Sequence, residues 1–90
     1  MIYEWDENKA KLNLAKHGVS FDDARTVFAD PFYVDFYDPD HSYTEDRFII
    51  LGKSARGKLL FVSYMERNNS IRLISAREAT PSEQRAYEQD

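Results

Sequence analysis

The sequence predicts one α+β domain, in which an antiparallel β-sheet has two N-terminal helices and one C-terminal helix packed on one face. Apolar residues recur at helical spacing in the first third of the chain, and the middle alternates with the period of a strand. A helix-capping motif then opens the last eleven residues. Because 90 residues leave room for one small core, we expect a single domain over residues 1–90, with the order β-α-α-β-β-β-β-α.

Capping residues define the first two elements. Ile2–Trp5 alternates as a short strand does, and Asp6 is a good N-cap for the helix that follows. This helix is predicted to end at His17, because Gly18 readily takes the left-handed conformation common after a helix.

A second helix is predicted to begin after Ser20, with an acid at Asp23 that completes its N-terminal signal. It should end at Asp30, because the residue before Pro31 disfavours the helical conformation. Its apolar residues fall at helical spacing and are expected in the core: Phe21, Ala24, Val27 and Phe28.

Four strands are predicted in the middle of the chain. Gly57 and the pair Asn68-Asn69 mark the turns of two hairpins, and a polar loop over 38–43 precedes them. The last helix should start at Thr80, which is followed by Pro81 at the first helical position and an acid two residues later. The predicted strands are Phe32–Tyr37, Arg47–Leu51, Leu59–Met65 and Ile71–Ser75.

Charge is distributed unevenly along the chain. Residues 47–77 hold seven Lys or Arg and one acid, whereas residues 30–46 hold six acids and no Lys or Arg. The whole chain has a formal net charge of -4. A cationic sheet in an acidic protein indicates a local site for a phosphate polyanion, not a surface that coats nucleic acid along its length.

The Asn68-Asn69 hairpin predicts which side chains share a face of the sheet. As a two-residue turn, it places Arg67 opposite Ser70, Met65 opposite Arg72, and Ser63 opposite Ile74. Arg67 and Arg72 then share one face, and Arg77 has the wrong parity to join them unless the chain bends after Ser75. The other face is the candidate core, with Leu60, Val62, Tyr64, Ile71 and Leu73.

The hairpin at Gly57 has two possible registers. If Gly57 is the left-handed residue of a bulged turn, Ser54 opposes Lys58, Arg47 opposes Met65, and Glu45 opposes Arg67. We favour this register, which brings Glu45 and Arg47 to the face of Arg67 and Arg72. A simple even loop would instead turn Arg47 toward the core.

Several classes of protein are excluded by composition. The chain has no cysteine, which removes disulfides, thiolate zinc sites and thiol nucleophiles. We expect a soluble cytoplasmic protein, because no signal peptide or membrane-spanning apolar run is present. His17 and His41 lack the spacing of metal ligands, and no glycine-rich phosphate loop exists, so no metal or cofactor is expected.

An ordered set of short motifs extends along nearly the whole chain. The motifs are Trp5-Asp6, Lys16-His17-Gly18, Phe21 with Ala24, Val27 and Phe28, Glu45-Asp46-Arg47, and Arg72-Leu73-Ile74-Ser75-Ala76-Arg77 followed by Glu83 and Tyr87. Each motif is weak alone, but their combination is specific, and it resembles the BrnT family, the toxins of bacterial type II toxin–antitoxin pairs. The resemblance implies a RelE-like fold and a metal-independent endoribonuclease that inhibits translation. It also implies a BrnA-type antitoxin, through which alone the toxin would reach operator DNA.

RNA cleavage of this kind needs no metal, because the 2′-hydroxyl can attack the adjacent phosphorus while protein groups move protons and stabilise charge. Guanidinium groups suit the phosphate, which makes Arg67, Arg72 and Arg77 the candidate catalytic arginines. Glu45 and His17 are the candidates for proton transfer, although arginine neighbours should lower the pKa of Glu45 and weaken it as a base. Candidate RNA-binding residues are Arg47, Lys53 and Tyr87.

Each candidate also has a purely structural interpretation. His17 could stabilise a helix C-terminus, Arg47 and Glu45 could form a surface pair, and Tyr87 could belong to the core or face the antitoxin. Two other functions stay open: a nucleic-acid-binding module that cuts nothing, and a structural protein whose arginines meet an acidic polypeptide.

Overall fold

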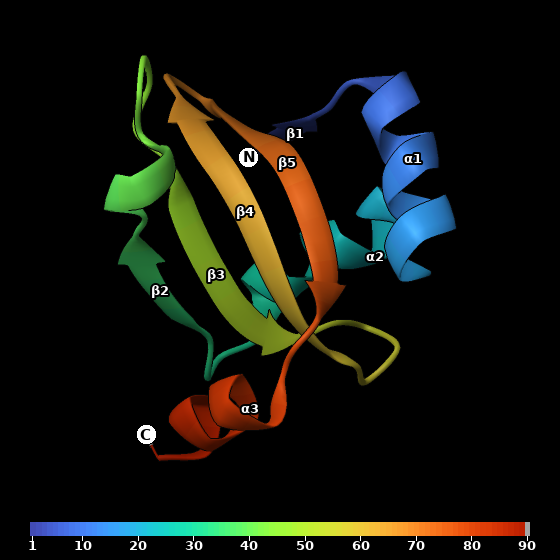
Figure 1. Cartoon of the computed structure of the whole chain (residues 1–90), viewed down its shortest axis with the longest axis vertical. Coiled ribbons are helices and arrows are strands. Elements are labelled where there is room, and N and C mark those ends of the chain that lie inside the picture. The colour runs from blue at the N-terminus through green and yellow to red at the C-terminus, as the bar shows by residue number, and fades with distance from the viewer. Residues whose placement is uncertain (90) are drawn as a thin grey trace.

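A computed structural model describes residues 1–89 and shows an α+β architecture around one five-stranded sheet with the strand order β1-β5-β4-β3-β2 (Figure 1). The predicted α+β class is confirmed. The expectation of a wholly antiparallel sheet is wrong, because β1 pairs in parallel with β5. No hairpin links these two strands, so turn chemistry gave no sign of their pairing. The strands are β1 (Ile2–Glu4), β2 (Val34–Tyr37), β3 (Phe48–Lys53), β4 (Leu59–Arg67) and β5 (Ser70–Glu78).

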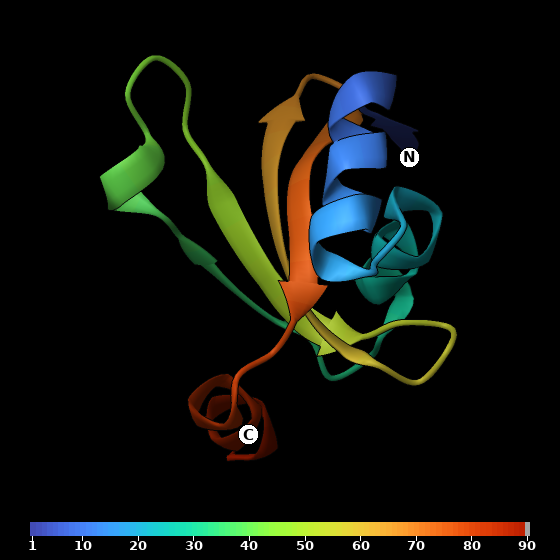
Figure 2. The same cartoon turned by 45° about the vertical axis from the view of Figure 1, so that its right-hand side comes forward.

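Helices lie on both sides of this sheet. The helix α1 (Glu7–His17) and the short helix α2 (Phe21–Ala24), which continues as the 3₁₀ helix η1 (Arg25–Ala29), cover one face. The helix α3 (Pro81–Glu88) lies at one end of the sheet, on the other side from α1 (Figure 2). The expectation that all helices pack on one face is therefore wrong for α3. None of the helices in residues 1–89 is both long and apolar enough to cross a membrane.

The predicted caps are present. Asp6 accepts hydrogen bonds from the first turn of α1, and Gly18 ends that helix with φ 70°. Ser20 caps α2, and Thr80 forms a reciprocal capping box with Glu83 at the start of α3. Between β2 and β3, a 3₁₀ turn η2 (Pro39–His41) occupies the polar loop.

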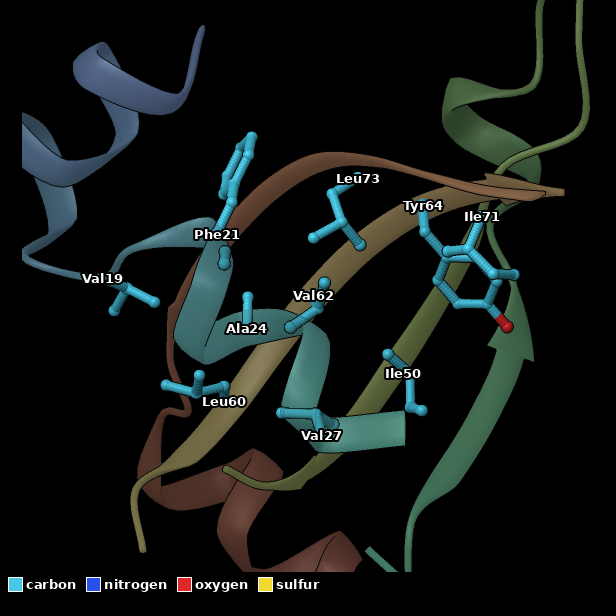
Figure 3. Close-up of a cluster of buried hydrophobic side chains, with 11 residues drawn as sticks. Val19, Phe21, Ala24, Val27, Ile50, Leu60, Val62, Tyr64, Ile71 and Leu73 are labelled. Carbon is cyan, nitrogen blue, oxygen red and sulfur yellow. The ribbon is translucent and has the colours of Figure 1, made fainter. Parts of the chain in front are cut away.

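The core lies between the sheet and the two N-terminal helices (Figure 3). It contains the sheet residues predicted for it, all 5% exposed or less: Leu60, Val62, Tyr64, Ile71 and Leu73. From the helical side it receives Phe21, Ala24 and Val27, with Phe28 packed against it. The two N-terminal helices therefore do not cover the opposite face of the sheet.

Both hairpins have the predicted turns. Gly57 has φ 80°, and the amide of Ser54 donates to the carbonyl of Lys58, as the bulged register requires. Arg67 lies opposite Ser70 and Met65 opposite Arg72, as expected. Ser63, however, pairs with Ser75 and not with Ile74, because a β-bulge in β5 leaves Ile74 as an extra residue.

A buried asparagine takes the place of a missing strand beside the second half of β5. β1 ends at Glu4, opposite Arg72, so the next backbone groups of β5 need other partners. The side chain of Asn13 on α1 donates to the carbonyl oxygen of Ala76 at 2.9 Å and accepts from its amide at 3.0 Å. It also donates to the carbonyl of Val19 at 2.9 Å. Asn13 therefore joins α1 to the sheet edge.

We expect Asn13→Ala to lower the free energy of unfolding by about 2 kcal/mol, because it leaves buried backbone groups of Ala76 without partners. Urea denaturation followed by circular dichroism measures this change. Asn8→Ala, on the exposed side of the same helix, is the matched control and should stay within about 0.5 kcal/mol of wild type. Equal stabilities for the two variants would contradict the role of Asn13.

Candidate functional site

Three arginines lie on the face of the sheet opposite α1, which we call the arginine face. By strand parity it comprises Arg67, Arg72 and Arg77, with Phe61 and Met65 between them. The bulge at Ile74 shifts the alternation of side chains in β5 by one residue. Arg77 therefore lies opposite Phe61, on the same face as Arg67 and Arg72, whereas the unbulged register predicted from the sequence placed it on the other face. A bulge before Ser75 thus replaces the bend after Ser75 that the sequence had suggested would be needed.

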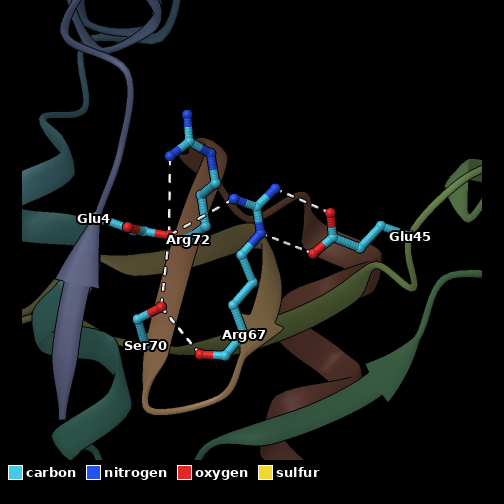
Figure 4. Close-up of polar contacts among 5 residues, drawn as sticks. All are labelled: Glu4, Glu45, Arg67, Ser70 and Arg72. Carbon is cyan, nitrogen blue, oxygen red and sulfur yellow. Dashed lines mark hydrogen bonds and ion pairs between the residues drawn. The ribbon is translucent and has the colours of Figure 1, made fainter.

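Two of the three arginines, Arg67 and Arg72, lie close to each other, and Arg77 lies farther along the sheet. Arg72 lies opposite Met65 and Arg77 opposite Phe61, so their positions are four residues apart along β4, or about 13 Å. Arg67 and Arg72 instead both reach toward Glu4 on β1 (Figure 4). The arginine face is therefore an elongated strip and not one point.

Arg67 is held by Glu45, from the loop before β3. Its Nε and one terminal nitrogen donate to the two carboxylate oxygens of Glu45 at 2.8 and 2.9 Å. The hydrogen bonds from Arg67 hold the pKa of Glu45 below its usual value, and Glu45 in turn raises the pKa of Arg67. The expected contact between Glu45 and Arg67 is thus confirmed. A carboxylate with a lowered pKa is a weaker base and a better anchor for the guanidinium.

Arg72 is the least restrained of the three. Its guanidinium lies 3.9 Å from an oxygen of Glu4 and makes no hydrogen bond within residues 1–89. The same Glu4 oxygen is 3.9 Å from Arg67 and accepts a long hydrogen bond from Ser70 at 3.5 Å. The Arg72 side chain is 29% exposed, so its donors can reach a ligand on the surface.

Arg77 is fixed from two sides. It donates to both carboxylate oxygens of Glu83 on α3 at 2.8 and 2.9 Å, and these bonds lower the pKa of Glu83. Its guanidinium carbon lies 4.1 Å from the centre of the Phe61 ring. Arg77 therefore links α3 to the arginine face.

Sequence reasoning missed two of the three carboxylates beside these arginines. Glu4 reaches Arg72 because β1 pairs with β5, and Glu83 had been assigned only its capping role. For Glu83, the acid at the third position of a helix that starts four residues after Arg77 was an available signal. Only the partner of Arg67, Glu45, was predicted.

Aromatic and aliphatic side chains share the face with the arginines. Phe36 on β2 packs edge-on against Phe61, with ring centres 6.4 Å apart, and is 48% exposed. By strand parity, the buried Ile49 and Leu51 of β3 lie on the same face. Apolar rings beside guanidinium groups are what single-stranded nucleic acid binds, through bases and phosphates respectively.

Three other candidates form no hydrogen bond or ion pair with these arginines within residues 1–89. His17 ends α1, where it lines a shallow hollow with Ile74 and Ser75, and its imidazole makes no hydrogen bond within the described residues. Arg47 precedes β3, with its amide bonded to Ser42, and it forms no ion pair with Glu45 in the part of the chain that the structure describes. Lys53 lies at the far end of β3, opposite Leu59, and by strand parity on the arginine face.

Tyr87 anchors α3 to the body of the domain. Its hydroxyl donates to Asp30 at 2.7 Å. Burial together with the Asp30 carboxylate raises the pKa of Tyr87 to about 12. The hydroxyl is thus engaged in holding α3 against the end of η1.

Every guanidinium of the face therefore has a carboxylate near it: Glu45 beside Arg67, Glu83 beside Arg77, and Glu4 at a longer distance from both Arg67 and Arg72. Such pairs keep the guanidinium groups oriented, and an entering phosphate would compete with the carboxylates for the same donors. Arg72 has the weakest competitor and is the first group that a phosphate can occupy. The face fits a phosphodiester with flanking bases.

Comparison with protein families identifies the chain. The family model described as the ribonuclease toxin BrnT of type II toxin–antitoxin systems matches residues 5–83. The chain belongs to the BrnT family. Members of this family are ribonuclease toxins, so an RNA target and an antitoxin partner follow from membership.

A solved BrnT structure has the same fold. The crystal structure of the ribonuclease toxin BrnT of Brucella abortus matches with a TM-score of 0.64 and 24% sequence identity, over 89% of this chain and 99% of that chain. At this identity the likeness establishes the architecture alone. No curated protein matches the chain significantly.

Proposed function

We propose that this BrnT-family chain is a metal-independent endoribonuclease with a RelE-like fold, which cuts RNA in the cytoplasm and thereby inhibits translation. The observation that carries the proposal is the placement of Arg67, Arg72 and Arg77 on one open face of the sheet. A BrnA-type antitoxin would neutralise the toxin by covering this face, and operator DNA would be bound only through that antitoxin.

The chemistry follows from what RNA supplies. The 2′-oxygen forms a bond to phosphorus while the bond from phosphorus to the 5′-oxygen breaks, which yields a 2′,3′-cyclic phosphate and a free 5′-hydroxyl. One proton leaves the 2′-hydroxyl and one reaches the 5′-oxygen. Arg72 would donate to the phosphoryl oxygens as their charge rises, since its donors have no closer partner. Arg67 and Arg77, held by their carboxylates, would bind the phosphates on either side.

Two groups are proposed for proton transfer. Glu45 lies beside Arg67, but its lowered pKa favours the positioning of that arginine over the acceptance of a proton. His17 carries an imidazole, the commonest general acid or base, and lies beside Ser75, a residue that by parity belongs to the arginine face. An RNA strand that crosses β5 would bring substrate to this imidazole. Arg47, Lys53 and Tyr87 would add contacts along the strand.

The test is incubation of the purified protein with an end-labelled mRNA in the presence of EDTA. We expect fragments whose 3′ ends carry cyclic or open phosphates, with an unchanged rate when the chelator is present. Binding of the RNA without any fragments would instead establish the non-cleaving nucleic-acid module. A rate abolished by the chelator and restored by a divalent cation would contradict metal independence.

A further inference from the structure

A pocket separate from the arginine face lies on the helix-covered side of the sheet, beyond the end of η1. We call it the Tyr64 pocket; its volume is about 250 Å³. In Figure 3, the Tyr64 ring lies to one side of the helical segments, with its hydroxyl directed away from them. The pocket is lined by Met1, Tyr3, Phe28, Tyr33, Asp35, Ile50, Tyr64, Glu66 and Ile71.

Aromatic rings form the walls of the Tyr64 pocket. The rings of Tyr3 and Phe28 are 5.4 Å apart, and those of Phe28 and Tyr64 are 5.0 Å apart at nearly right angles. Tyr33 adds a fourth ring among the lining residues. Rings in several orientations around one small space offer their electron-rich faces to a cation.

Two carboxylates at the pocket have no cationic partner. Neither Asp35 on β2 nor Glu66 on β4 forms an ion pair within residues 1–89, the terminal ammonium of Met1 included. No Lys or Arg lines the pocket. On the arginine face, by contrast, Glu45 and Glu83 are each bound to an arginine.

The Tyr64 hydroxyl is a further polar group at the pocket. Tyr64 is 3% exposed, and its hydroxyl interacts with the carboxylate of Asp35. Burial raises its pKa well above the ordinary value, and the carboxylates of Asp35 and Glu66 raise it further. The pocket is thus negative in potential, and the Tyr64 oxygen can still accept a hydrogen bond.

We propose that the Tyr64 pocket binds the side chain of a Lys or Arg from a basic segment of the antitoxin; the choice of antitoxin as its source rests on the proposed function. The aromatic walls would stack on the cation, Asp35 and Glu66 would pair with it, and the Tyr64 oxygen would accept a hydrogen bond. The volume suits one side-chain head and falls below that of a site for a whole small ligand.

The surroundings favour an extended peptide as the source of this cation. β2, which carries Asp35, is the last strand of the sheet and has one unpaired edge. Four large aromatic side chains on or beside β2 are 45% exposed or more: Phe32, Tyr33, Phe36 and Tyr37. A basic segment that runs along β2 could therefore bury these rings while one cationic side chain enters the pocket.

The first experiment uses two end-capped peptides that differ only in the charge of one side chain. One carries a central arginine between apolar residues, and the other carries citrulline, the neutral isostere. Amide chemical shifts of ¹⁵N-labelled protein report binding. We expect saturable shifts at the pocket residues with the arginine peptide and at least about tenfold weaker binding of the citrulline peptide. No saturable shift at the pocket, or equal affinity for both peptides, would overturn the proposal.

The second experiment removes the charges of the pocket. Asp35→Asn combined with Glu66→Gln keeps size and removes both carboxylates, and Asp22→Asn combined with Asp40→Asn removes two exposed charges elsewhere. We expect the pocket variant alone to lose about tenfold or more in affinity for the arginine peptide and for the antitoxin. Equal losses in both variants would reduce the effect to net charge and overturn the pocket.

RNA cleavage by the same variants separates the two proposals. The pocket variant should cleave RNA at the wild-type rate, because neither carboxylate lies on the arginine face. If wild type cleaves no RNA, the proposed function fails while the peptide measurements still decide whether the pocket binds a cation. Peptide binding without any effect on the antitoxin complex would overturn the antitoxin as the source.

Discussion

Replacement of Arg72 by alanine is expected to lower the rate of RNA cleavage by about 10²–10³-fold, with little loss of stability. Arg72 is the arginine of the face whose donors are least committed, since Glu4 at 3.9 Å is its nearest carboxylate. Its guanidinium is therefore free to follow the charge that develops on phosphorus. Initial rates with a labelled RNA measure the effect, and thermal unfolding measures the stability.

The matched controls separate charge from position. Arg72→Lys keeps one positive charge and loses the planar fork, so we expect an intermediate rate. Arg56→Ala removes an exposed arginine from the tip of the Gly57 hairpin and should leave cleavage unchanged. A stably folded Arg72→Ala protein with undiminished cleavage would rule out the role of Arg72 in the reaction.

The parts of the fold set by neighbouring residues were predictable from the sequence. Gly57 has to take a positive φ in a bulged turn, and this local requirement fixes the pairing of Ser54 with Lys58. The Asn68 turn fixes Arg67 opposite Ser70 in the same way. Since a strand alternates with period two, these registers were enough to place Arg67 and Arg72 on one face.

Features set by distant parts of the chain were not predictable. The bulge at Ile74 has no glycine or proline to mark it, yet it decides on which face Arg77 lies. The pairing of β1 with β5 joins residues about 70 positions apart and brings Glu4 to Arg72. Asn13 replaces a strand through two hydrogen bonds to Ala76 that no local pattern encodes. Each case depends on which segments meet in the folded chain.

The roles of the site residues divide in the same manner. The alternation of side chains along a strand predicted that arginines from neighbouring strands would share a face. The carboxylates that restrain them are brought there by tertiary contacts, and of these only Glu45 was predicted. His17 and Lys53 have the right chemistry in the sequence, but in the fold His17 lies at the end of α1 and Lys53 at the far end of β3. Their predicted roles therefore depend on the path that RNA takes across the surface.

The largest loss of stability is expected from Asp30→Ala. This buried carboxylate accepts hydrogen bonds from the amide of Phe32 at 2.9 Å, the amide of Lys53 at 2.7 Å and the hydroxyl of Tyr87 at 2.7 Å. It thereby holds together the end of η1, the end of β3 and the helix α3. Its loss leaves three donors without an acceptor, so we expect the free energy of unfolding to fall by about 3 kcal/mol. Tyr87→Phe, which removes one of these bonds, should cost about 1 kcal/mol.

The pH dependence of stability tests this role independently. Burial opposes the ionisation of Asp30, but the amides of Lys53 and Phe32 and the Tyr87 hydroxyl outweigh it and bring its pKa below the ordinary 3.8. A lowered pKa means that the folded state binds fewer protons than the unfolded state. Asp30 therefore stabilises the fold above its unfolded pKa, and this contribution disappears as the pH falls through its folded pKa. The stability difference between wild type and Asp30→Asn should be full at pH 7 and shrink below about pH 4. A difference that stays constant from pH 7 into this acidic range would show that the carboxylate charge at Asp30 does not hold α3 in place.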